Sequence, residues 1–189
     1  MTAHFKLVVG LAGMPGAGKS VVVNVAKDMG YGVVVMGDVV REETVNRGLA
    51  LNPENVGRVM LELRAEDGDG VIAKRCIPRI DKTKEGKVIV DGIRSLSEVE
   101  VFAKHYSNFM LIAVHASPEV RFQRLYQRRR SDDSADWKVF HERDMRELSV
   151  GLGNAISMAE HIIINDGTLN AAETKTKEAL MKAELEWRT

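Results

Sequence analysis

The sequence predicts an α/β sandwich in which helices cover both faces of a parallel sheet, and three observations support this class. Short apolar runs rich in β-branched residues recur along the chain, and helical patterns fill the gaps between them. Runs such as Val88-Ile89-Val90 and Ile162-Ile163-Ile164 lack the alternation of a half-exposed strand, so we expect strands buried on both faces. Strand and helix also alternate, which implies parallel strands joined by crossover helices. The expected strands are residues 6–12, 32–36, 87–90, 110–115 and 161–164.

The composition indicates one compact domain over residues 1–189. Its 44% hydrophobic content is enough to fill a substantial core, and its formal net charge of zero argues against a nucleic-acid scaffold or a membrane-surface protein. Cys76 is the only cysteine, which leaves neither an intramolecular disulfide nor a multi-thiolate metal site and is typical of a reducing cytoplasm. The apolar run at residues 7–14 is too short to cross a bilayer. We therefore expect a cytoplasmic protein that binds neither nucleic acid nor membrane.

A glycine-rich segment directly after the first expected strand matches the pattern G-x-x-x-x-G-K-[ST] and opens a predicted helix over residues 20–29. Backbone N–H groups of such a turn converge on phosphate oxygens, and the helix N-terminus adds about half a positive charge there. We expect Lys19 to reach the β- and γ-phosphates and Ser20 to coordinate Mg²⁺, so the predicted cofactors are ATP and Mg²⁺. The alternative is a chance glycine-rich turn, but such a turn would not require a strand before it and a helix after it. The residues predicted to hold the nucleotide are Gly13, Met14, Pro15, Gly16, Ala17, Gly18, Lys19 and Ser20.

Asp91 follows the third expected strand, where a P-loop protein places the carboxylate that orients Mg²⁺ or its water. We predict a catalytic and metal-binding role for it; a simple turn or cap residue is the alternative. Its neighbour is Gly92, not the glutamate with which many P-loop hydrolases activate water, and an N/T-K-x-D guanine-reading motif is absent. Both absences favour phosphoryl transfer to a second substrate over a GTPase switch.

Two arginines resemble the acceptor clamps of nucleoside monophosphate kinases. The stretch Met36-Gly37-Asp38-Val39-Val40-Arg41 resembles the adenylate kinase G-D-x-x-R segment, which implies that Arg41 holds the acceptor phosphate. Asp91-Gly92-Ile93-Arg94 is similar to D-G-F-P-R and, although one residue shorter, implies the same role for Arg94. Residues 38–85 read as about three helices, which we interpret as an acceptor-binding insertion. Asp38 is the candidate general base if the acceptor is a hydroxyl. The alternative for each arginine is an ordinary ion pair with a surface carboxylate.

A run of arginines resembles the lid of adenylate kinases, in which an R-x-D-D sequence leads to a later arginine. Here Arg130-Ser131-Asp132-Asp133 and Arg143 match that pattern, so a short lid over residues 128–143 is expected. The catalytic candidates on this side are Arg124, Arg128, Arg130 and Arg143; a solvated basic helix is the alternative. After the last strand, Asn165 and Gly167 lie in a loop similar to the one that contacts the nucleotide base in these kinases, although a plain turn fits equally.

Along nearly its whole length the chain resembles an archaeal family described as adenylate-kinase-related or dephospho-CoA-kinase-like. The resemblance implies a P-loop NTPase three-layer sandwich, with a five-stranded parallel sheet and acceptor-binding helices inserted after the second strand. It also implies transfer of the γ-phosphoryl of Mg-ATP to a small phosphorylated metabolite, such as a nucleoside monophosphate or dephospho-CoA. The alternative is a nucleotide-dependent switch or assembly ATPase that works with a protein partner and has no small-molecule acceptor.

Overall fold

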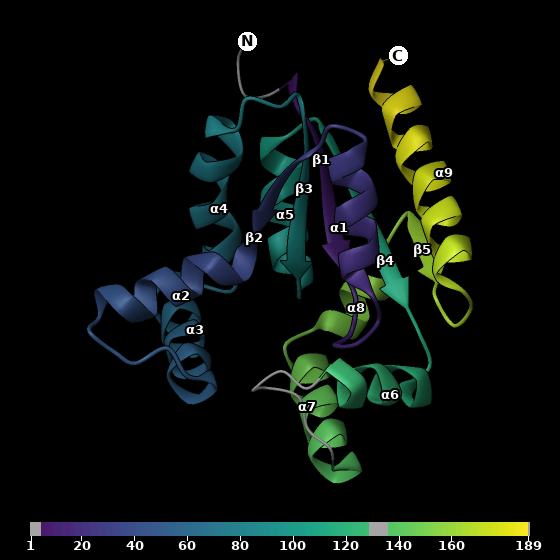
Figure 1. The fold of residues 1–189 in the computed structure, drawn as a ribbon. Coiled ribbons are helices and arrows are strands. Elements are labelled where there is room, and N and C mark those ends of the chain that lie inside the picture. The colour runs from purple at the N-terminus through teal and green to yellow at the C-terminus, as the bar shows by residue number, and fades with distance from the viewer. Residues whose placement is uncertain (1–4, 129–135, 189) are drawn as a thin grey trace.

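The computed structural model describes residues 5–128 and 136–188 (Figure 1). Five strands form one sheet in the order β2-β3-β1-β4-β5, and every neighbouring pair is parallel. The strands are β1 (Leu7–Ala12), β2 (Gly32–Val35), β3 (Lys87–Ile93), β4 (Asn108–His115) and β5 (His161–Ile164). The expected parallel α/β architecture is confirmed.

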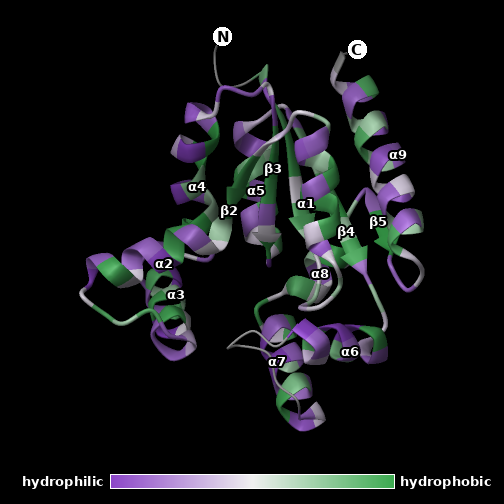
Figure 2. Ribbon diagram, in the orientation of Figure 1, coloured by the Kyte–Doolittle hydropathy of each residue, from purple (hydrophilic) through white to green (hydrophobic). Residues whose placement is uncertain are grey.

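Helices cover both faces of this sheet and form two separate hydrophobic cores. On one face, α1 (Lys19–Asp28) and α9 (Leu169–Arg188) pack on the side chains of Leu7, Val9 and Leu11. On the other, α4 (Val71–Lys82), α5 (Leu96–His105) and α8 (Leu152–Ser157) belong to the cluster that contains Val8 and Ala12. Alternate residues of β1 thus enter opposite cores, which explains the unbroken apolar run. Figure 2 shows the resulting hydrophobic strands between helices whose outer faces are hydrophilic.

As expected, three helices separate β2 from β3. They are α2 (Met36–Asn46), α3 (Pro53–Asp67) and α4. In Figure 1, α2 and α3 project beyond the sheet as an arm. The second strand is shorter than predicted, since Met36 already begins α2. The third is longer: Asp91 lies inside β3 and pairs with Leu11 on one side and Val35 on the other. Because β1 and β2 both pair with Asp91, β3 continues beyond the apolar run that ends at Val90. The apolar pattern alone does not reveal this extension.

The remaining helices, α6 (Pro118–Arg128) and α7 (Trp137–Ser149), lie beyond the carboxyl ends of the strands (Figure 1). Aromatic rings join them: the Phe122 ring lies 5.1 Å from the Trp137 ring and 5.4 Å from the Phe140 ring, measured between centroids. Residues 129–135, which include Arg130 and part of the predicted lid, lie outside the described residues. Among the residues that the structure does describe, no helix is long and apolar enough to cross a membrane.

Candidate functional site

The loop between β1 and α1 has the shape that the glycine-rich motif predicts. Gly16 and Gly18 have φ angles of +80° and +98°, a region that favours glycine. A Cβ on Gly18 would lie only 2.2 Å from Nδ2 of Asn165, so the loop also needs glycine for space. The first turn of α1 carries no acidic residue and opens directly at this loop. The site therefore combines a tight turn with a helix N-terminus, the arrangement that binds phosphate.

Lys19 is the positive centre of the loop. Its Nζ donates a hydrogen bond of 2.6 Å to the Gly13 carbonyl oxygen. Burial lowers the pKa of this amine, and the nearby Asp91 carboxylate acts in the opposite direction. Arg94 and Arg143 lower the pKa further by repulsion, whereas Glu147 raises it. Charges from β3, from the turn that follows it and from α7 thus converge on the P-loop lysine.

Asp91 provides a partly buried carboxylate near that amine. Burial raises its pKa, the positive charges of Lys19 and Arg94 lower it, and the negative charge of Asp38 raises it again. Its Oδ1 atom is buried and has no hydrogen-bond partner within the described part of the chain. Ser20, the second predicted metal ligand, is exposed in the first turn of α1.

Oxygen donors of this kind fit Mg²⁺, which is usually held by one or two carboxylates together with substrate phosphates and water. Residues 5–128 and 136–188 contain no group of three or more His, Cys, Asp or Glu side chains that could hold a metal without such help. The donor set therefore fits a magnesium ion that arrives with a nucleotide.

The two predicted acceptor arginines both have carboxylate partners. Arg41 donates to Asp38 at 2.5 Å on the exposed side of α2. The Arg94 Nε lies 3.5 Å from a Glu147 carboxylate oxygen of α7, and its Nη1 donates to Sδ of Met60 in α3 at 3.6 Å, so the side chain lies between α7 and the arm. The ion-pair alternative is thus observed for both side chains, and an acceptor anion would have to compete with these carboxylates.

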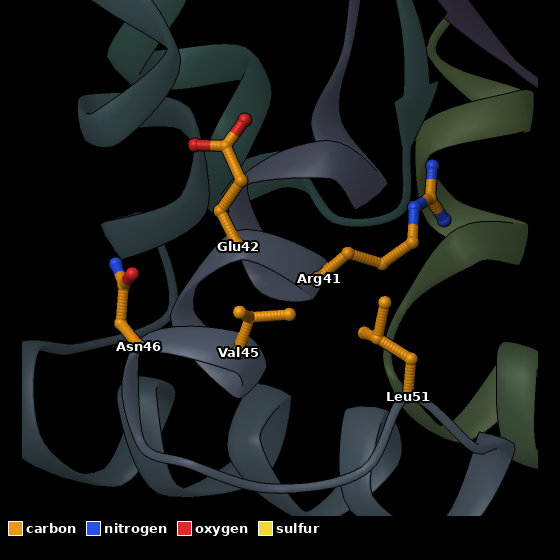
Figure 3. A pocket seen from close by; sticks show the side chains of 5 residues that line it. All are labelled: Arg41, Glu42, Val45, Asn46 and Leu51. Carbon is orange, nitrogen blue, oxygen red and sulfur yellow. The ribbon is translucent and has the colours of Figure 1, made fainter.

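A shallow hollow lies along α2 beside Arg41, with a volume of about 250 Å³. In Figure 3 the Arg41 side chain extends away from Glu42, and Leu51 lies next to it from the loop after α2. Val45 and Leu51 are largely exposed, so part of the wall is apolar. The hollow is lined by Arg41, Glu42, Val45, Asn46 and Leu51.

Arg124 and Asn165 meet behind the P-loop. The Asn165 side chain is buried, and its Nδ2 donates to the Ala17 carbonyl oxygen at 2.9 Å. Arg124 donates to the same oxygen and to Oδ1 of Asn165, both at 3.4 Å. The Asn165 side chain thus supports the P-loop. A contact between Gly167 and a nucleotide base stays a prediction. Arg128 ends α6, and Arg143 lies close enough to Lys19 to affect its pKa.

Two buried ion pairs beside these residues were missed by sequence reasoning. In the first, which we call the arm anchor, Arg64 of α3 donates to Glu98 of α5 at 2.9 Å, and Glu98 also accepts the backbone N–H of Arg94 at 2.7 Å. In the second, the loop anchor, Arg121 of α6 pairs with Asp144 of α7 through two hydrogen bonds of 2.9 and 2.5 Å. A capping pattern, Ser95-Leu96-Ser97-Glu98, was the available signal for Glu98.

The comparisons with known proteins agree with this geometry. The family model described as AAA domain matches residues 12–140. A UPF0200 protein of Methanocaldococcus jannaschii is 51% identical over 162 residues, which cover 85% of this chain and 82% of the relative. One of Hyperthermus butylicus is 43% identical over 182 residues, covering 96% of this chain and 97% of the relative. The chain belongs to the UPF0200 family and carries an AAA domain.

Solved structures identify the fold. TT1252 from Thermus thermophilus superimposes with a TM-score of 0.63 at 18% identity, covering 94% of this chain and 97% of the other. A shikimate kinase from Bacteroides thetaiotaomicron gives 0.57 at 15% identity, covering 94% and 98%. A gluconokinase from Sinorhizobium meliloti gives 0.53 at 13% identity, covering 97% and 98%. The predicted P-loop three-layer sandwich is confirmed, while the narrower likeness to adenylate and dephospho-CoA kinases stays a prediction.

Proposed function

We propose that this protein is a small-molecule kinase that transfers the γ-phosphoryl group of Mg-ATP to an acceptor bound between α2 and α7. One observation carries the proposal: a predicted acceptor arginine lies at the same edge of the sheet as the P-loop. Asp91 of β3 pairs with Leu11, which lies just before the P-loop, and beyond Asp91 the Arg94 side chain lies 3.5 Å from Glu147 of α7. A nucleotide on the P-loop would therefore face the acceptor residues directly. Solved neighbours whose names include shikimate kinase and gluconokinase support the same reaction class.

Catalysis in such a site rests on positioning and charge neutralisation. The P-loop amides and Lys19 hold the nucleotide phosphates, and Arg124, Arg128, Arg130 and Arg143 are the proposed lid-side cations. Ser20 and Asp91 would hold Mg²⁺, which supplies further charge neutralisation when it is bound. The buried, unpartnered Oδ1 of Asp91 supports that role, because a bound cation would give this atom a partner.

For the acceptor we favour a phosphorylated metabolite, such as a nucleoside monophosphate or dephospho-CoA. Arg41 and Arg94 already bind the anionic groups of Asp38 and Glu147, so they are placed to bind a phosphate instead. A hydroxyl acceptor is the second candidate, for which Asp38, the carboxylate beside Arg41, is the proposed general base.

The test is a screen of the full-length protein with γ-labelled ATP and Mg²⁺ against three acceptor sets: nucleoside monophosphates, dephospho-CoA, and hydroxyl acids including shikimate and gluconate. Label in an acceptor product that disappears in a Lys19→Ala variant supports the kinase. Label released only as free phosphate, and stimulated by protein partners, would support the switch ATPase instead. Product from the hydroxyl acids alone would replace the phosphorylated acceptor by the second candidate.

A further inference from the structure

Arg121 is an arginine buried directly behind the P-loop, with only 4% of its surface exposed. Its Nε donates to the Ala116 carbonyl oxygen, and its Nη1 donates to the Pro15 carbonyl oxygen, both at 3.1 Å. Nη1 and Nη2 also bind the two carboxylate oxygens of Asp144, and the guanidinium carbon lies 5.0 Å from the Phe140 ring centroid. A single cation therefore joins the end of β4, the P-loop and α7.

The P-loop also packs on the main chain of Arg121. A Cβ on Gly16 would lie 2.7 Å from the Arg121 carbonyl oxygen, so the two backbones touch with no side chain between them. Because Pro15 and Gly16 both contact Arg121, a displacement of Arg121 would also displace the P-loop.

Asp144 sits between two residues that reach the active site. Arg143 precedes it on α7, and Glu147 lies three residues after it. Both are close enough to Lys19 to shift the pKa of its amine, in opposite directions. Arg143 and Glu147 are four residues apart and so share one face of the helix, while Asp144 points to Arg121. Since a helix is a rigid element, fixing Asp144 fixes the position of both neighbours.

We propose that the loop anchor is a positioning device, which holds α7 against the P-loop so that Arg143 is placed to act on the nucleotide phosphates. Arg121 and Asp144 are positioning residues, because Arg121 binds the loop, Asp144 binds Arg121, and the pair acts on the nucleotide through Arg143. The inference rests on the proposed function, which places a nucleotide on the P-loop. A pair that only stabilised the fold would leave the contribution of Arg143 unchanged.

A double-mutant cycle separates these roles. The dissociation constant of a fluorescent, non-hydrolysable Mg-ATP analogue is measured for full-length wild type, Asp144→Asn, Arg143→Ala and the double variant. We expect Asp144→Asn to weaken binding by about tenfold in wild type but by less than about twofold beside Arg143→Ala, as for residues that act through one another. Glu142→Gln is the matched control: it removes an exposed carboxylate from the same helix, and affinity should not change.

Thermal denaturation of each variant confirms that it is folded at the assay temperature. If Asp144→Asn does not fold, Arg121→Lys takes its place in the cycle, because lysine keeps the charge but loses the two-pronged bond to Asp144. Equal losses in both backgrounds, or no loss in either, would overturn the proposal, and so would a wild-type protein that does not bind the analogue. The readout needs no acceptor, so a protein that binds the analogue and phosphorylates nothing would refute the kinase while the cycle still decides on the anchor.

Discussion

Replacing Glu98 with alanine tests how the structure holds the acceptor side of the site. Glu98 is 1% exposed and accepts hydrogen bonds from the Arg64 guanidinium and the Arg94 backbone N–H. The Arg64 side chain is itself only 9% exposed, so Glu98→Ala leaves a charge with little access to water and an N–H group without its acceptor.

The size of the effect follows from that burial. Removing one partner of a buried ion pair costs about 3–5 kcal/mol, since the remaining charge is neither paired nor hydrated. For a chain of 189 residues, each kcal/mol lowers the unfolding midpoint by roughly 2–4 °C. We therefore expect Glu98→Ala to lower the midpoint by about 6–20 °C. Glu98→Gln keeps a hydrogen-bond acceptor and loses only the charge, so its loss should be intermediate.

The assay is reversible urea denaturation followed by circular dichroism, with thermal melts as a second measure. Glu62→Ala is the control, because Glu62 pairs with Arg47 at 2.8 Å but is 43% exposed, and exposed pairs contribute only about 0–1 kcal/mol. The reasoning is wrong if Glu98→Ala and Glu62→Ala destabilise the protein equally.

Three further predictions concern the P-loop and its carboxylate. Lys19→Ala should reduce phosphoryl transfer by about 10³-fold or more, measured with labelled ATP, because it removes the cation that faces the phosphates. Asp91→Asn should abolish Mg²⁺-dependent transfer yet raise the melting temperature at pH 7. Burial raises the pKa of Asp91 above its ordinary 3.8, so its ionised form opposes folding, and the gain in melting temperature should shrink as the pH falls toward 3.8. Gly18→Ala should destabilise the protein by about 1–3 kcal/mol in urea titrations, since its Cβ meets Asn165 at a positive φ. Gly57→Ala, whose Cβ meets nothing within 4 Å in α3, should instead be neutral or stabilising.

The sheet and the P-loop could be predicted from the sequence because their signals are local. The inner strands are buried on both faces and so form unbroken apolar runs, and the glycine-rich motif carries its own strand–turn–helix context. The same expectation was wrong for Ile162-Ile163-Ile164, because β5 lies at the edge of the sheet and leaves Ile162 and Ile164 49% and 46% exposed. The extension of β3 through Asp91 was missed because Asp91 is polar and carries no strand signal of its own. It is part of the strand because β1 and β2 pair with it on both sides.

The anchors were missed because their partners are far apart in the sequence. The pattern Ser95-Leu96-Ser97-Glu98 does form a helix cap, since the Ser95 hydroxyl accepts the Glu98 N–H at 3.3 Å. The Glu98 carboxylate, however, binds Arg64, which lies 34 residues away. Arg121 and Asp144 are likewise 23 residues apart, and only the packing of α6 on α7 decides that Arg121 is buried against Asp144.

The contact between Arg94 and Glu147 differs from the two anchors in a way that bears on how an acceptor phosphate would bind. It joins the acceptor side to α7 over 3.5 Å, and the Arg94 side chain is 41% exposed, so water already competes for it. The arm anchor and the loop anchor are shorter and almost fully buried. Because partly solvated pairs contribute little and buried pairs are costly to break, an acceptor phosphate would displace Glu147 from Arg94 before it disturbed either anchor. Under the proposed function, the Arg94 backbone and α7 would therefore keep their places while the ion pair between them exchanges its carboxylate for substrate.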